Sequence, residues 1–123
     1  AKELSTCKGL EALGAALVEA VSHGADARNW VLENGSEDRN AAGGASVNYM
    51  MLMGYLCGAW VMGKSSLKAS QMLSSGSGDT SFLETKLVTT RFYFDHLLPR
   101  TKAYLSMITA GSESMMALDV DKF

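Results

Sequence analysis

Residues 82–110 have the sequence FLETKLVTTRFYFDHLLPRTKAYLSMITA, and the spacing within this stretch decides the fold. Apolar or small residues recur at alternating intervals of four and three, at Leu83, Leu87, Thr90, Phe94, Leu97, Thr101, Tyr104 and Ile108. This period places one continuous stripe along an α-helix and is typical of helices that pack side by side. We therefore predict a long helix over 82–110 that packs against other helices.

The ends and the single proline of this helix carry further signals. Pro99 lacks the amide hydrogen that would donate to the carbonyl of Asp95. Because the stripe keeps its phase on both sides of the proline, we predict a kink and not a break. Ser81 followed by Glu84 has the form of a capping box at the start of the helix, and Gly111 tolerates the left-handed backbone that ends one.

Two more helices are predicted upstream. The first spans 2–33 and ends before Asn34 and Gly35, and its stripe consists of Leu10, Leu13, Leu17, Ala20, Gly24, Ala27 and Val31. The second spans 37–73 and is apolar on nearly all sides in its middle. A polar Ser/Gly loop follows at 74–80, and the tail after residue 111 has at most one helical turn near 115–118. The sequence predicts an all-α, up-down bundle of three long helices in a single domain, 1–123.

The predicted helices are long for a three-helix domain. A helix of thirty residues is about 45 Å long, and three such rods leave much apolar side surface uncovered. We therefore expect a fourth helix that is missing here or is supplied by a partner. The chain starts at Ala1 without Met or a signal peptide, and helical patterning begins at once. We interpret the chain as part of a longer polypeptide.

Composition excludes several classes of function. A hydrophobic fraction of 47% and a charged fraction of 20% are ordinary for a soluble domain. The net charge of −2 and the lack of a basic stripe argue against a nucleic-acid partner. The uncharged stretch 41–63 is long enough for a bilayer, but its five glycines and its polar Ser46 and Asn48 favour a buried central helix over a membrane span. Two cysteines, Cys7 and Cys57, favour free thiols in a cytoplasmic protein.

Candidate site residues are few. His23 and His96 are isolated from other metal ligands in sequence, so no metal site is predicted. Opposed carboxylates, a nucleophile elbow and a phosphate-binding loop are all missing from the sequence, so no catalytic residue is predicted and cofactor-binding residues stay unknown.

Two groups of side chains leave alternatives open. Four methionines lie in the second predicted helix, at Met50, Met51, Met53 and Met62. They are more typical of core packing than of an adaptable docking face. The cations of the third helix are Lys86, Arg91, Arg100 and Lys102. A solvated helix face is the favoured interpretation. The alternative is contact with a phosphate-bearing ligand such as a coenzyme A tail.

Two stretches resemble a known family. Residues 48–67 (NYMMLMGYLCGAWVMGKSSL) contain a tyrosine–glycine–tryptophan pattern from Tyr49 to Trp60. Residues 86–99 are similar to a Lys-Leu-x-x-x-Arg-Phe-Tyr-x-x-His-Leu-Leu-Pro motif, and 108–111 to a closing Ile-Thr-Ala-Gly turn. The chain thereby resembles the helical C-terminal domain of one branch of the acyl-CoA dehydrogenase family, the 3-methylmercaptopropionyl-CoA dehydrogenase-like branch.

The resemblance implies a parent flavoenzyme that binds FAD and removes hydrogens across the α,β bond of an acyl-CoA. In that family a glutamate acts as base, the flavin takes the hydride, and electrons pass to an electron-transferring flavoprotein. The base and the main FAD contacts lie upstream of this domain, so no catalytic residue carries over; Arg91 and His96 match the pattern without an assigned role. The resemblance implies a non-catalytic domain that packs on the catalytic core or stabilises it. The alternative is a free-standing helical interaction module that forms a homodimer.

Overall fold

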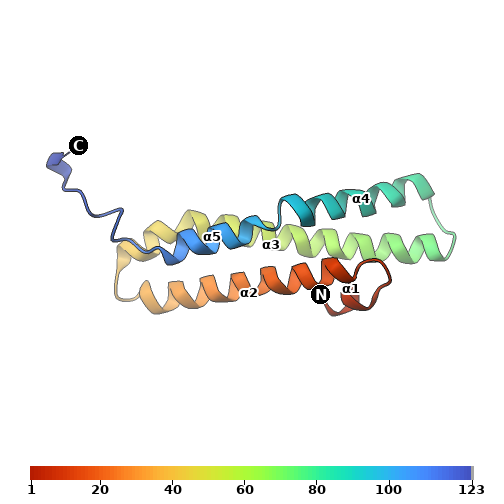
Figure 1. Cartoon of the computed structure of the whole chain (residues 1–123), viewed down its shortest axis with the longest axis horizontal. Helices are drawn as coiled ribbons and strands as arrows, with labels where there is room; N and C mark the ends of the chain where they lie inside the picture. The colour runs from red at the N-terminus through yellow and green to blue at the C-terminus, as the bar shows by residue number, and fades with distance from the viewer. Residues whose placement is uncertain (123) are drawn as a thin grey trace.

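Helix α3 (Arg39–Ser74) is the central element of the fold, which a computed structural model describes for residues 1–122 (Figure 1). Helix α2 (Glu11–Asn34) runs antiparallel to α3 on one side, and α4 (Thr80–His96) followed by α5 (Arg100–Thr109) returns along another side. The short helix α1 (Lys2–Thr6) precedes α2. The predicted all-α bundle is confirmed.

The first predicted helix is two helices, so its prediction as one rod over 2–33 was wrong. Gly9 has φ +85, in the left-handed region that glycine adopts easily, and the chain reverses there. Helix α1 folds back beside the start of α2 (Figure 1). Gly14 permits this close contact, because a Cβ there would lie 2.6 Å from the backbone nitrogen of Ser5. The break also explains why the predicted stripe of this helix starts only at Leu10.

The third predicted helix is also two helices, and the prediction of a kink without a break was wrong. Leu97, Leu98 and Pro99 form a turn between α4 and α5, in which the amide of Leu98 donates to the carbonyl of Tyr93 (2.9 Å). The missing amide of Pro99 ends the regular ladder. At this turn Leu98 takes the buried position predicted for Leu97, which is only half-buried, and the stripe continues as predicted at Thr101 and Ile108.

Aspartate side chains cap the N-termini of α3 and α4. Asp79 accepts a hydrogen bond from the amide of Phe82 (3.0 Å) and caps α4, so the predicted capping box of Ser81 and Glu84 was wrong. Asp38 accepts from the amide of Asn40 (2.9 Å) and caps α3.

The C-terminal tail is tied to the start of α3. Ser112 donates a hydrogen bond to Asp38, and this bond is the main reason that the pKa of Asp38 lies below its ordinary value. The tail then leads away from the bundle to a short 3-10 helix, η1 (Val120–Lys122) (Figure 1). The predicted helical turn near 115–118 is not an α-helix.

The core consists of two apolar clusters along the bundle axis. One joins α1, α2, α3, α4 and the turn before α5, and its members are Leu4, Leu10, Leu13, Leu17, Ala20, Ala59, Phe94 and Leu98. The other joins α2, α3 and α5, and its members are Ala27, Ala45, Leu52 and Ile108. Buried hydroxyls bond to their own helices or turns, as Thr90 does to the carbonyl of Lys86 (2.9 Å). Within residues 1–122, no buried side-chain polar atom lacks a hydrogen-bond partner.

Candidate functional site

One face of α3 is apolar and uncovered. Its residues follow each other at intervals of four and three, are all exposed, and form what we call the α3 outer stripe: Gly43, Val47, Met50, Gly54, Cys57 and Val61. The side chains of Val47 and Met50 are each 62% exposed and that of Val61 is 53% exposed. This spacing is the one by which a helix packs against a neighbour, but within residues 1–122 no neighbour covers it. The apolar middle of this helix, predicted as a buried central helix, is therefore buried on some sides and exposed along this stripe.

Two glycines of the α3 outer stripe face open space in the described part of the chain. A Cβ at Gly43 or at Gly54 would meet no atom within 4 Å. A glycine inside a helix costs about 1 kcal/mol relative to alanine, so open space alone gives no reason for it. Lack of a side chain does allow another backbone to approach closely. The α3 outer stripe thus has the composition of a contact surface.

The predicted methionine cluster is divided between core and surface. Met53 packs against the cluster around Leu52, and Met62 packs against the cluster around Phe94. Met51 is half-buried, whereas Met50 lies on the α3 outer stripe. Core packing therefore accounts for Met53 and Met62, and the docking alternative applies to Met50.

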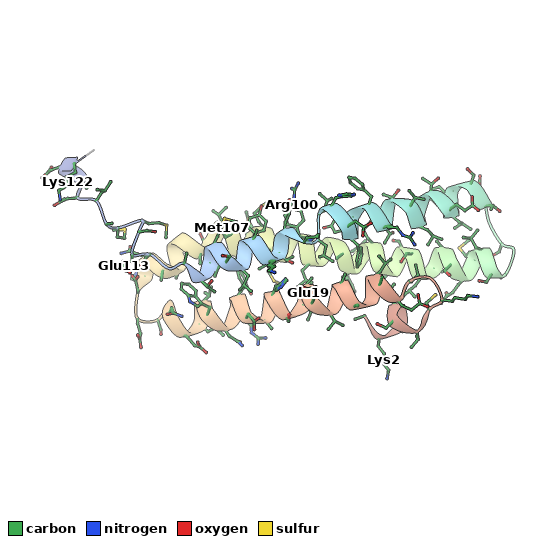
Figure 2. The ribbon with its side chains drawn as sticks, in the orientation of Figure 1. Lys2, Glu19, Arg100, Met107, Glu113 and Lys122 are labelled. Atoms are coloured by element: carbon green, nitrogen blue, oxygen red, sulfur yellow. The ribbon has the colours of Figure 1, made fainter. Side chains whose placement is uncertain are left out.

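A polar junction joins α3 to the break between α4 and α5. The hydroxyl of Tyr93 donates to the carbonyl of Tyr55 (2.9 Å), and Arg100 donates to the hydroxyl of Tyr55 (2.8 Å). The ring of Tyr55 also stacks on that of Tyr104, with centroids 5.8 Å apart. Figure 2 shows Arg100 at the start of α5, beside this break. These contacts hold the two helices in line where the backbone ladder is interrupted.

The junction should make the folded chain less stable at alkaline pH. Burial, and then the neighbouring Tyr55 and Cys57, raise the pKa of Tyr93 above its ordinary value. Below about pH 10 the phenol is neutral in the folded and the unfolded state. Above it the unfolded chain ionises first, so we expect the free energy of unfolding to decrease as pH rises towards the raised pKa. Urea unfolding from roughly pH 8 to pH 11 measures this decrease.

The control for this prediction is Tyr93→Phe. It should cost about 1 kcal/mol at neutral pH, because the bond to the carbonyl of Tyr55 is lost. The free energy of unfolding of this variant should also decrease less steeply above about pH 10. An identical alkaline slope in both proteins would contradict a role of Tyr93.

The four cations of the predicted third helix do not gather. Lys86 lies in a hollow with Phe82 and near its ring, with the ammonium 5.1 Å from the ring centroid. Arg100 is held by Tyr55, and Lys102 lines a small hollow with His23 on another side. Of the four, only Arg91 faces the hollow between the start of α2 and α4. These four cations therefore do not form one group, and Lys86 shares its hollow with Lys64 and Lys68 of α3.

This hollow, here called the α2–α4 groove, has a volume of about 540 Å³ and lies between the turn after α1, the start of α2 and α4. Its apolar lining comes from Leu10, Leu13, Leu87, Val88 and Phe92. Its charged or titratable lining comes from Lys8, Glu84, Arg91 and His96. The ring of His96 packs on that of Phe92 with centroids 4.9 Å apart. Both motif residues, Arg91 and His96, thus face one site, which sequence spacing alone did not indicate.

The remaining candidate residues are His23 and the two cysteines. His23 lies with its Nδ1 3.0 Å from the hydroxyl of Thr101, between α2 and α5. Both cysteines are free as predicted: Cys57 is exposed, and the sulfur of Cys7 lies 3.6 Å from the hydroxyl of Ser70. In the part of the chain that the structure describes, no three potential metal ligands come together. Over the same residues, no helix combines the length and the apolar character that crossing a bilayer requires.

Comparison with known proteins finds two similarities. Residues 1–119 match the family described as acetyl-CoA dehydrogenase C-terminal like. A relative, the 3-methylmercaptopropionyl-CoA dehydrogenase of Ruegeria pomeroyi, is 33% identical over 100 residues. The aligned part covers 81% of this chain but 17% of that relative, so the chain spans a small fraction of the relative's length.

Proposed function

The chain belongs to the acetyl-CoA dehydrogenase C-terminal-like family, and from this membership we propose that it is a non-catalytic domain of an FAD-dependent acyl-CoA dehydrogenase-like oxidoreductase. Residues 1–123 form one helical domain of that parent enzyme. The domain packs on the catalytic core through the α3 outer stripe and stabilises that core.

The α3 outer stripe is the observation that carries this proposal. It has the four-three spacing of a packed helix, its glycines are open to close approach, and the surrounding stretch 41–63 contains no charge. Fully burying a side chain such as Val47, Met50 or Val61 contributes about 1.5–3 kcal/mol. A helix of the parent laid along the stripe gains this free energy and completes a four-helix bundle.

The parent's cofactor and substrate belong to other parts of the enzyme. In the family that the chain resembles, the main FAD contacts lie upstream of this domain. We therefore place FAD, the acyl-CoA and the contact with an electron-transferring flavoprotein outside this domain, in a cytoplasmic parent.

Val61→Glu in the full-length parent tests the docking surface. A carboxylate buried against the core without a partner is costly, so we expect Tm to decrease by several degrees and the domain to become sensitive to protease. The matched control is Val18→Glu on α2, where Val18 is 56% exposed and lies off the stripe. In the 123-residue chain alone, both variants should stay within about 0.5 kcal/mol of the original. Equal Tm values for both full-length variants would contradict docking through this stripe.

A second copy of the chain could cover the same stripe, which keeps the homodimer as the second candidate. Sedimentation of the 123-residue chain separates the two. A monomer with an intact fold agrees with docking on a parent core. A dimer that Val61→Glu converts to a monomer would replace the proposal with the homodimeric module.

A further inference from the structure

We propose that the α2–α4 groove binds a small monoanionic carboxylate that carries an apolar tail. The groove shares no residue with the α3 outer stripe, so this site is independent of the docking proposed above. Its volume of about 540 Å³ lies in the range of small-molecule sites, which combine apolar walls with a few polar groups.

The apolar part of the groove suits a hydrocarbon tail. Leu10 and Leu13 are buried in the core and line the groove from the start of α2. Val88 and Phe92, which line it from α4, are 68% and 56% exposed. An apolar tail between these walls would cover Val88 and Phe92, and their removal from water favours binding.

The charges of the groove suit one carboxylate. Lys8 and Arg91 contribute two positive charges and Glu84 one negative charge, which leaves an excess of one positive charge on a chain whose net charge is −2. The guanidinium of Arg91 can donate two parallel hydrogen bonds to a carboxylate. A single excess positive charge is matched by a monoanion, whereas a dianion would leave one negative charge uncompensated.

The groove results from the break after α1. Gly9 reverses the chain there, and the resulting turn brings Lys8 to the same hollow as Arg91 of α4. Ser70 of α3 also lines the groove, and its hydroxyl lies 3.6 Å from the sulfur of Cys7 in the same turn. On the α4 wall, the ring of Phe92 packs on that of His96. The site thus combines residues from three separate segments.

Decanoate is the probe, titrated into the 123-residue chain and followed by NMR at the methyl groups of Leu13 and Val88. We expect Arg91→Met to weaken decanoate binding about tenfold, because the charged hydrogen bonds are lost while much of the apolar stem stays. Arg28→Met, the same change at an exposed site on α2 away from the groove, should leave binding unchanged. Decanol, which has the same tail without the charge, should bind more weakly than decanoate.

Charge changes at exposed Val88 give an independent test that leaves Arg91 intact. Val88→Lys should tighten decanoate binding and Val88→Asp should weaken it, each with an unchanged circular dichroism spectrum. The proposal is overturned if decanoate leaves the Leu13 and Val88 methyl shifts unchanged. It is equally overturned if decanol binds as well as decanoate, or if both Val88 variants bind decanoate alike.

Discussion

Leu52→Ala is expected to lower the free energy of unfolding by about 3 kcal/mol, because it opens a cavity that the surroundings can fill only in part. Leu52 is fully buried and belongs to the cluster of Ala27, Ala45 and Ile108. Its terminal Cδ2 also lies 3.7 Å from the place where a Cβ of Gly24 would be. Its glycine and alanine neighbours have no flexible side chain that could move into the space, so the site collapses only as far as Met53, which packs on the same cluster, can move.

Urea unfolding of the 123-residue chain measures this loss, with Val47→Ala as the control. Val47 lies on the same helix but is 62% exposed, so its truncation should change the free energy of unfolding by less than about 0.5 kcal/mol. A similar loss in both variants would mean that the exposed side of α3 is covered in the isolated chain. It would then point to self-association, which sedimentation of the same samples detects.

The sequence predicts the helices well because their stripes are long and regular. Helices α2 and α3 end at Asn34 and Ser74, each one residue after the predicted ends near Glu33 and Leu73. The breaks were missed for local reasons. Gly9 was treated as one position of a long pattern, although its left-handed backbone reverses the chain. At Pro99 the stripe is continuous in the sequence, because Leu97 and Leu98 are both leucines and either one fits between the buried Phe94 and Thr101.

The contact surface and the groove were harder to predict. An uncharged stretch such as 41–63 predicts burial but does not say what provides it. Gly43 and Gly54, placed on the same stripe as Val47 and Val61, were the available signal for an external partner. No sequence signal could have found the groove, because Lys8 and Arg91 come together only through the reversal at Gly9.

Gly58→Ala and Gly54→Ala are the same change one helical turn apart, and we expect them to have opposite effects. A Cβ at Gly58 would collide with the hydroxyl of Tyr93 and lie 2.8 Å from its Cζ. The Tyr93 ring would have to move, and its hydrogen bond to the carbonyl of Tyr55 would be lost. The combined cost exceeds the gain in helix propensity, so Gly58→Ala should destabilise the chain by about 2 kcal/mol.

Gly54→Ala meets open space and should stabilise the 123-residue chain by up to about 1 kcal/mol, since alanine favours the helix more than glycine. In the full-length parent the same methyl group would face the docked helix, so the gain should disappear or become a loss. Thermal unfolding of both variants in both proteins measures these four effects. If Gly54→Ala raised Tm equally in the chain and in the parent, nothing would approach the α3 outer stripe closely, and the glycines would need another explanation.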